Sequence, residues 1–319
     1  MGYQMPILNS ASRFAVSTRR ELLAKLLGVT ALSCAAKAAG EVASVRLAIS
    51  ETMVSDVNMN DARAAMLIWI KRMSAELNVR VEINPKVFDT TEEILRRVRR
   101  NELDAIALNV IEYRQIAQLL DSTQIISEDD ASGPEEYLLL AKRASGIKRL
   151  GDLRARRICT LKAPKMCVAP AWLATILDEG HCGPVDQFFA SMTTETKVSR
   201  VVLPVFFGQA DACLTSKRGF DTMCELNPQV AKDLTAIASS PPMVVDFYIF
   251  NKNYRGVSRE RFARVYSDLP RSVSGRQLAT MFQFESLAVK NISCLAPALA
   301  VIEAAERIHA RPGAGPRKG

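Results

Sequence analysis

The groups in this sequence that are best placed for binding chemistry are hydroxyls and a lysine near the starts of predicted helices. Thr90 and Thr91 open one helix through the capping box Thr90-x-x-Glu93, and Lys165 lies shortly before a second helix that starts at Pro170. Helix N-terminal amides and hydroxyl donors together hold tetrahedral oxyanions well. The sequence therefore predicts an anion site built from two parts of the chain. Simple helix capping by the threonines and a solvated position for Lys165 are the alternatives.

Further polar side chains occur at the ends of strands or inside them. Thr215 and Ser216 end a short apolar strand that begins at Asp211, and Asp246 lies within an apolar strand. An unpaired buried carboxylate is costly, so we expect Asp246 to face a cleft or a hinge. Tyr113 stands at a strand–helix junction, where it is either a ligand contact or a core residue with a hydrogen-bonded hydroxyl.

Two similar helix–turn–strand units position these groups. The first unit turns at Asn101 and enters a strand through Asp104-Ala105. The second unit turns at Gly208 and enters a strand through Asp211-Ala212, so the turn residue and the aspartate are equally far apart in both units. Glycine or asparagine just past a helix suits the left-handed conformation that ends it. Ligands of parallel α/β sheets bind outside the carboxyl ends of the strands. The repetition predicts two α/β lobes whose polar strand ends face a shared cleft.

The order of the predicted elements gives the same architecture. Strands and helices alternate from residue 45 to about 135, which is typical of a parallel sheet with helices on its faces. Breaks at Gly133-Pro134 and Pro241-Pro242 precede strands that would cross between the lobes and form a hinge. A helix is expected from Asn227 to Ala238, and mainly helices after 250. The predicted domains are a first lobe of 45–135 plus 245–309, a second lobe of 136–244 and a disordered tail at 310–319.

The N-terminus, residues 1–38, has the features of an export signal. The pair Arg19-Arg20 precedes an apolar stretch from Leu26 to Ala36 and a small-residue exit at Ala36-Lys37-Ala38, which is the order found in exported proteins. The arginine pair resembles a twin-arginine signal, with Leu22 and Ala24 where phenylalanine and lysine are usual. We expect export to the periplasm by a twin-arginine or Sec route and cleavage near Ala38. An amphipathic N-terminal helix is the alternative.

Composition argues against several classes of protein. The net charge of the 319 residues is +8, but the basic excess lies mainly in the two ends, so nucleic-acid binding is not expected. With only His181 and His309 and no P-loop, nucleophile-elbow or zinc-protease motif, we expect no metal site, no cofactor and no catalysis by histidine. Export would permit disulfides, and Cys167 with Cys182 is one possible pair.

Several of these segments together resemble the periplasmic solute-binding proteins of phosphonate- and phosphate-type ABC importers. The likeness spans residues 45–285. It is carried by Leu47–Glu51, Thr91 to Asp104-Ala105, Ile111-Glu112-Tyr113, Ser145–Leu153, Gly208-x-x-Asp211-Ala212 and Ser240–Asp246. The resemblance implies an α/β, two-lobed type II periplasmic-binding-protein fold. Each lobe would be a mainly parallel sheet flanked by helices, and two hinge crossings would join them.

The resemblance also implies roles for single residues. Tyr113 matches a tyrosine that the family places at the ligand, and Asp246 matches an acidic residue that can face a substrate amino group. The family's Ser-Thr-Ser-Gly loop reads Ala163-Pro164-Lys165-Met166 here, so two hydroxyls are replaced and a lysine is gained. The expected ligand-binding residues are Ser50, Glu51, Thr90, Thr91, Tyr113, Lys165, Thr215, Ser216 and Asp246.

The function implied by the resemblance is non-catalytic. We expect a monomer that binds a small oxyanion of the phosphonate, phosphite or phosphate class between its lobes and delivers it to an ABC permease. A ligand sensor on the same fold, signalling to a membrane receptor kinase or cyclase, is the alternative. An enzyme is less expected. Related folds include a pyrimidine-forming enzyme of thiamine biosynthesis, which uses its own histidine and a cysteine cluster, and this sequence has no such cysteine cluster and no histidine expected to point inward from a helix.

Overall fold

The structure of the chain is a computed structural model. It describes residues 44–54, 58–84, 86–129, 134–268, 271, 276, 279–280 and 286–311. All of these belong to one compact unit that comprises residues 43–319. The expected export signal at 1–38 lies outside the described residues, as does the expected tail from residue 312 onward.

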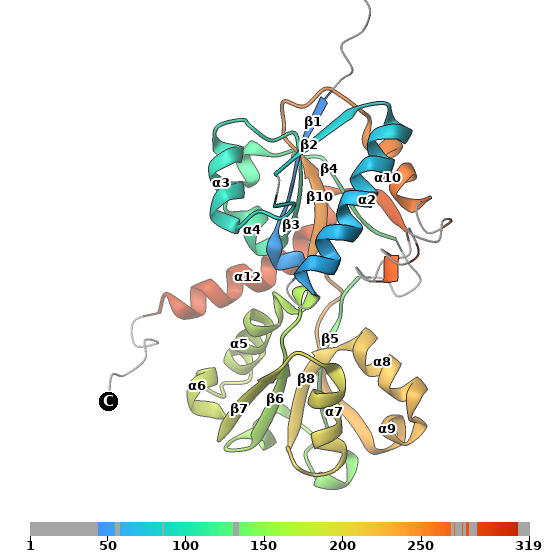
Figure 1. Cartoon of the computed structure of the whole chain (residues 1–319). Helices are drawn as coiled ribbons and strands as arrows, with labels where there is room; N and C mark the ends of the chain where they lie inside the picture. Colours follow the sequence, from blue (N-terminus) through green and yellow to red (C-terminus); the bar gives the residue numbers. More distant parts are fainter. Residues whose placement is uncertain are drawn as a thin grey trace, which may run out of the picture. The chain divides into compact units, whose positions relative to one another are not determined.

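A six-stranded mixed sheet, here called the first sheet, has the strand order β11-β4-β10-β3-β1-β2 (Figure 1). Its strands are β1 (Ser44–Ile49), β2 (Arg80–Ile83), β3 (Ala105–Asn109), β4 (Gln124–Glu128), β10 (Asp246–Phe250) and β11 (Leu287–Asn291). β1 runs parallel to β2 and β3, whereas β10 is antiparallel to both β3 and β4. The carboxyl ends of β1, β3 and β4 therefore lie beside the amino end of β10, along the edge of the sheet that is formed by strand ends.

Alternating side chains give the first sheet two apolar faces. Leu47, Ala107 and Tyr248 face one core cluster with α2 (Met59–Leu77) and α10 (Arg259–Ser267). Ala48 and Ile106 face the other cluster with α3 (Thr91–Arg99) and α4 (Val110–Arg114). The second cluster continues into the rest of the molecule without a break. The period of two along a strand thus sends neighbouring residues into separate cores.

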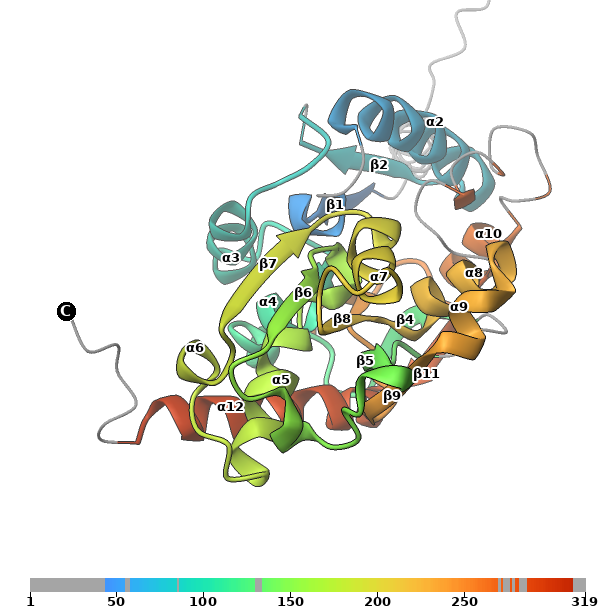
Figure 2. The same cartoon turned by 90° about the horizontal axis from the view of Figure 1, so that it is seen from below.

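The second sheet has five strands in the order β7-β6-β8-β5-β9 (Figure 2). They are β5 (Tyr137–Lys142), β6 (Arg157–Leu161), β7 (Ser191–Glu195), β8 (Ala212–Ser216) and β9 (Leu234–Ser239). Its helices are α5 (Ala169–Glu179), α6 (Val185–Phe188), α7 (Val198–Phe206), α8 (Lys217–Leu226) and α9 (Pro228–Asp233). Tyr137 pairs with Ser216, so the amino end of β5 lies beside the carboxyl end of β8. This sheet repeats the design of the first, and the predicted α/β fold with two sheets is confirmed.

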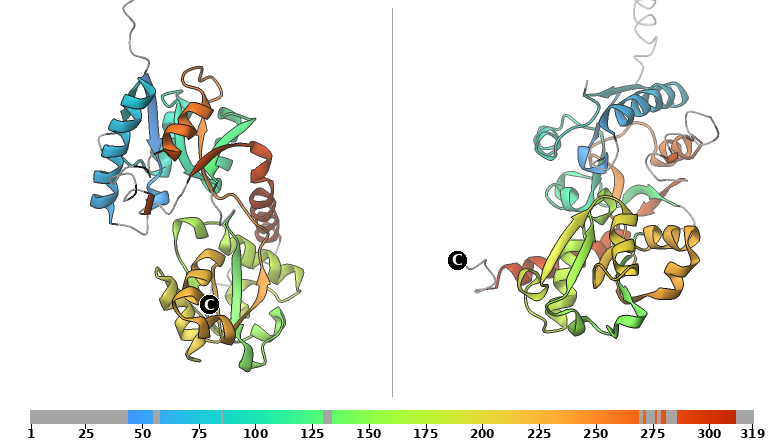
Figure 3. Two further views of the ribbon diagram at one scale, coloured as in Figure 1. Left: turned by 90° about the vertical axis from the view of Figure 1, so that its right-hand side faces the viewer. Right: turned by 60° about the horizontal axis from the view of Figure 1, so that its bottom comes forward.

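The chain passes between the sheets twice, after β4 and after β9 (Figure 3). The two passages pair with each other through Glu135 and Met243, whose backbone N–H groups each donate to the other's carbonyl at 2.9 and 2.8 Å. A third connection is α12 (Ala296–His309), which packs against α5. Ion pairs near its C-terminal end reach both halves: Glu306 pairs with Arg114 of α4, and Arg311, just after the helix, pairs with Asp178 of α5. The C-terminal helix, expected in the first lobe, thus also contacts the helices of the second sheet.

The two predicted turns have the expected geometry. Asn101 and Gly208 adopt φ angles of 56° and 76°, which is the left-handed region that ends helices. The aspartates that follow them are structural. Asp104 accepts hydrogen bonds from the backbone and guanidinium nitrogens of Arg46 at 2.7–2.9 Å, and Asp211 does the same with Arg157 at 2.9–3.5 Å. Both pairs lie where β1 and β6 begin, at the sheet edges away from the strands' carboxyl ends.

Several elements differ from the sequence-based expectation. Residues 234–239 form β9 and pair with β5, and the helix that begins at Pro228 ends at Asp233. Backbone pairing with β5 outweighs the helix propensity of the two alanines in that segment. Helix α2 is capped by Asn58, whereas the sequence had suggested Asn60 or Asp61 as the cap. Strands β4, β7 and β11 had no expected counterpart.

Candidate functional site

Four polar residues mark the edge of the first sheet where strand ends meet. Ser50 follows β1, Asn109 ends β3, Glu128 ends β4 and Asp246 begins β10 opposite Asn109. Ligands of α/β sheets bind outside such carboxyl strand ends. This edge is therefore the candidate site of the first sheet.

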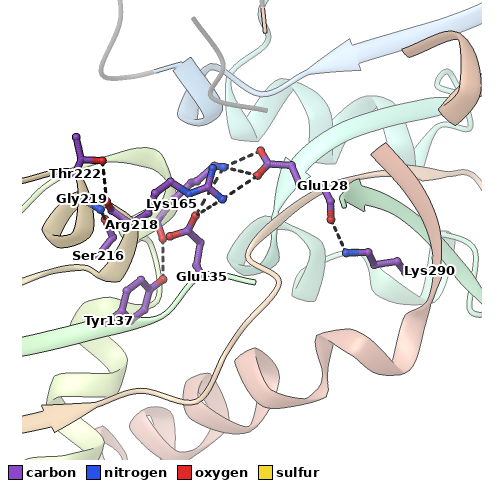
Figure 4. Close-up of polar contacts among 9 residues, drawn as sticks. All are labelled: Glu128, Glu135, Tyr137, Lys165, Ser216, Arg218, Gly219, Thr222 and Lys290. Atoms are coloured by element: carbon purple, nitrogen blue, oxygen red, sulfur yellow. Dashed lines mark hydrogen bonds and ion pairs between the residues drawn. The ribbon is translucent and has the colours of Figure 1, made fainter. Parts of the chain in front are cut away.

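An ion-pair network connects this edge to the second sheet, and Figure 4 shows Lys165 and Arg218 reaching Glu128 and Glu135. The Lys165 Nζ lies 2.7 Å from both carboxylate oxygens of Glu128 and 3.7 Å from Glu135. The Arg218 Nη2 lies 3.5 Å from Glu128 and 3.6 Å from Glu135. With Asp246, whose charge acts on both Glu128 and Lys165, we call these five residues the charge cluster.

The charge cluster contains three carboxylates and two cations, so negative charge is in excess. Burial and the nearby charge of Asp246 raise the pKa of Glu128 to about 7. Burial acts to lower the pKa of Lys165, but the charges of Asp246, Glu128 and Glu135 outweigh it and raise that pKa. Lys165 therefore stays charged, and Glu128 is the carboxyl group that holds a proton up to about pH 7, because three ionised carboxylates would exceed the two cations.

A second carboxylate, that of Glu112 on α4, collects hydroxyl donors at the same edge. Ser50 Oγ and Thr91 Oγ1 each donate to its Oε1 at 2.6 Å. Thr52 Oγ1 and the Asn109 backbone N–H donate to its Oε2 at 3.2 and 3.0 Å. Glu112 is only 3% exposed. The donors come from the end of β1, the start of α3 and the end of β3, so they converge on one buried anion.

Two cavities border the charge cluster. One of about 50 Å³ is lined by Glu128 and Asp246 together with apolar side chains such as Ile49, Met53 and Tyr248. Ser127, whose buried Oγ has no hydrogen-bond partner among the described residues, also contributes to its wall. A larger cavity of about 290 Å³ is lined by Glu135 and Arg218, among others. Both cavities place carboxylates of the cluster beside free space.

The predicted ligand residues fall into groups. Ser50 and Thr91 meet at Glu112, whereas Thr90 caps α3 in the predicted box with Glu93. Ser216 caps α8 by accepting from the Gly219 N–H, and Glu51 is exposed in the short helix η2 (Glu51–Val54). Capping, the simpler interpretation, accounts for Thr90 and Ser216.

The remaining predicted residues lie deeper. Tyr113 is buried edge-on against Phe247 at 5.4 Å between ring centroids, and burial raises the pKa of its hydroxyl. Thr215 is fully buried, and within the described part of the chain its Oγ1 has no hydrogen-bond partner. Lys165 is only 14% exposed in its side chain and pairs with carboxylates, so it is not a solvated surface lysine.

Several residues of the site were not among the predicted ligand residues, including all four that bear its other charges: Glu112, Glu128, Glu135 and Arg218. Glu112 lies in the segment Ile111-Glu112-Tyr113 and would have been found by asking which acidic residue follows the polar end of β3. Glu128 ends a strand whose apolar residues were too few to be recognised. Glu135 and Arg218 carry no local signal, because their roles depend on the pairing of β5 with β8.

The cysteines and helices of the described part give two further findings. Its six cysteines are free thiols, so the possible Cys167–Cys182 disulfide is absent. Cys167 follows the short helix Pro164–Met166, and burial, with the charges of Asp246 and Glu112, raises the pKa of its thiol well above the usual value. None of the described helices combines the length and the apolar character that a membrane span requires.

Comparison with known families gives one match. The model for the periplasmic substrate-binding protein of phosphonate ABC transporters matches residues 52–289, which is most of the chain. A search of curated protein sequences returned no match.

Solved structures share the fold at low sequence identity. A binding protein component of an ABC phosphonate transporter from Pseudomonas aeruginosa aligns with a TM-score of 0.53 and 14% identity, covering 84% of this chain and 88% of that one. PhnD1 from Prochlorococcus marinus in complex with methylphosphonate gives 0.54 and 13%, covering 84% and 100%. A Xanthomonas citri protein bound to chloride gives 0.56 and 13%, covering 83% and 98%. These alignments show a common fold.

Proposed function

The chain belongs to the family of periplasmic substrate-binding proteins of phosphonate ABC transporters, and from this we propose that it captures a small organic solute bearing a protonated amino group. The solute would be passed to the permease of an ABC importer. The chain acts by binding and has no catalytic role.

The observation that carries this proposal is the charge imbalance of the cluster. Glu128, Glu135 and Asp246 face Lys165 and Arg218. A ligand ammonium that reaches Glu128 and Asp246 takes the place of the Glu128 proton, so that all three carboxylates can be ionised while the cluster stays neutral. Both carboxylates line the cavity of the first sheet, so an amino group with a short apolar substituent fits its chemistry. Hydrogen bonds between an ammonium and carboxylates are also stronger than neutral ones.

A pure oxyanion finds fewer partners in this arrangement. The hydroxyls of Ser50 and Thr91 already donate to Glu112, and Lys165 is held by Glu128. An incoming phosphonate would have to displace an internal carboxylate at each of these donors. Binding of a phosphonate without an amino group is the second candidate function, because PhnD1, which has the same fold, was solved in complex with methylphosphonate.

A panel of three compounds of similar size separates the two functions: 2-aminoethylphosphonate, ethylphosphonate and ethylamine. Each is added to the chain at increasing concentration, and the melting temperature is recorded, since a ligand of the folded state raises it by mass action. We expect a rise with 2-aminoethylphosphonate and no rise with ethylphosphonate. Ethylamine reports whether the amino group alone suffices.

The opposite pattern refutes the proposal. A rise with ethylphosphonate equal to that with 2-aminoethylphosphonate supports the oxyanion function, and no rise with either amine contradicts amine binding. The control variant is Glu303→Gln, which changes an exposed carboxylate on α12 and should respond to the panel as the unmodified chain does.

A further inference from the structure

Glu112 occupies a position in which an external anion would otherwise be bound. Its two oxygens accept four hydrogen bonds, three from hydroxyls and one from a backbone N–H. A carboxylate has about four acceptor positions, so the side chain is saturated. The group is buried at the carboxyl ends of β1 and β3, where α/β proteins bind ligands.

Helix capping explains only part of this arrangement. Glu112 is the N3 residue of α4 and accepts from the Asn109 N–H, which completes a capping box. The other donors are unnecessary for a cap. Ser50, Thr52 and Thr91 are 62, 60 and 21 residues away in sequence, and they bring their hydroxyls to the same carboxylate from separate elements.

We propose that Glu112 is a specificity-determining residue that keeps oxyanions off the hydroxyl donors of Ser50, Thr52 and Thr91 by acting on them as an internal anion, so that a ligand cannot be held there by a phosphonate group. An external phosphonate would need the same hydroxyl protons and would meet a like charge at hydrogen-bond distance. The cost of leaving Glu112 buried without its donors adds to this repulsion. The inference rests on the proposed function only in taking this edge as the ligand site.

The test removes the internal anion and asks whether an external one takes its place. Glu112→Ala leaves the three hydroxyls and the Asn109 N–H without their acceptor. We expect this variant to be less stable, to bind methylphosphonate at least about tenfold more tightly than the unmodified chain, and to regain melting temperature when methylphosphonate is added. The unmodified chain should show no such rise. Glu112→Gln fills the same space and should not bind the anion.

A matched control is Glu93→Ala. Glu93 is also the N3 residue of a capping box, but within the described residues its side chain accepts hydrogen bonds only from Thr90, so added methylphosphonate should not restore the stability of this variant. If Glu112→Ala folds and methylphosphonate binds no more tightly than to the unmodified chain, the inference is wrong.

Thr91→Val keeps the inference testable even if Glu112→Ala does not fold. In the unmodified chain Thr91 serves Glu112, so this substitution should leave any affinity for methylphosphonate unchanged within about twofold. Measurable binding of methylphosphonate that is lost in Thr91→Val would show that the hydroxyls already serve an external anion, and it would overturn the inference. Neither outcome depends on whether an amine binds, so this inference and the proposed function can fail separately.

Discussion

The Nζ of Lys165 lies 2.7 Å from both carboxylate oxygens of Glu128, and this contact joins the end of β4 in the first sheet to the loop after β6 in the second. In this chain the lysine that the sequence offered for a ligand anion is paired with an internal carboxylate. Ionisation of Glu128 beside Asp246 then requires one further positive charge, which favours a ligand with a cationic group.

The raised pKa of Glu128 predicts how stability depends on pH. The folded state keeps the Glu128 proton up to about pH 7, whereas the unfolded state loses it near 4.5. Between these values the folded state binds more protons, so the free energy of unfolding falls as pH rises and levels off above 7. At about 1.4 kcal/mol per pKa unit, the fall is on the order of 3 kcal/mol.

Urea unfolding of the unmodified chain and of Glu128→Gln at pH 5, 6, 7 and 8 isolates this contribution. The difference between the two curves should show the fall, because the substitution removes the titrating group. Glu303→Gln should reproduce the unmodified curve. Parallel curves for the unmodified chain and Glu128→Gln, or an unmodified chain that gains stability relative to Glu128→Gln as pH rises, would contradict the raised pKa of Glu128.

The two aspartate–arginine pairs predict unequal losses of stability. Asp104→Ala removes the acceptor of the Arg46 N–H and guanidinium and should cost about 2 kcal/mol. Asp211→Ala should cost about 1 kcal/mol, because Arg157 and Asp211 are more exposed (53% and 23%) than Arg46 and Asp104 (36% and 16%). Urea unfolding measures both.

Neither aspartate variant should change the affinity for 2-aminoethylphosphonate, since both pairs lie at the edges remote from the charge cluster. A loss of affinity larger than about threefold in either variant would show that these aspartates do more than hold their strands.

Neighbouring threonines should behave differently toward Glu112. Thr90→Ala removes a helix cap and should cost about 1 kcal/mol whether or not Glu112 is present. Thr91→Val removes a hydrogen bond of 2.6 Å to Glu112, so its cost should shrink in the background of Glu112→Ala. Double-mutant cycles with urea unfolding give both coupling energies. A coupling for Thr90 as large as that for Thr91 would refute the separation of the two roles.

Much of the fold could be predicted because its signals are local. The turn residues Asn101 and Gly208, the capping box at Thr90 and the alternation of β1 each follow from a few neighbouring side chains. β7 escaped prediction because its side chains are largely exposed and polar. It is an edge strand held by backbone pairing with β6, which leaves little trace in the sequence.

The site was harder to predict than the fold. The sequence indicated polar residues near strand ends and helix starts, and Ser50 after β1, Thr91 at the start of α3 and Lys165 after β6 do have polar partners. The sequence did not show that the partners are carboxylates of the chain itself. Glu112 and Thr91 are separated by a whole helix and strand. Lys165 follows a strand of the second sheet, whereas Glu128 ends a strand of the first, so both pairs arise only from the packing of distant elements.

The most direct test of amine recognition is a cycle that removes the amino group from the ligand and the carboxylate from the protein. Isothermal titration measures the affinities of 2-aminoethylphosphonate and ethylphosphonate for the unmodified chain and for Asp246→Asn. We predict that the amino group improves binding to the unmodified chain by roughly 2 kcal/mol, about thirtyfold, and much less in Asp246→Asn. Equal affinities of the two compounds for the unmodified chain, or binding of neither, would contradict the account.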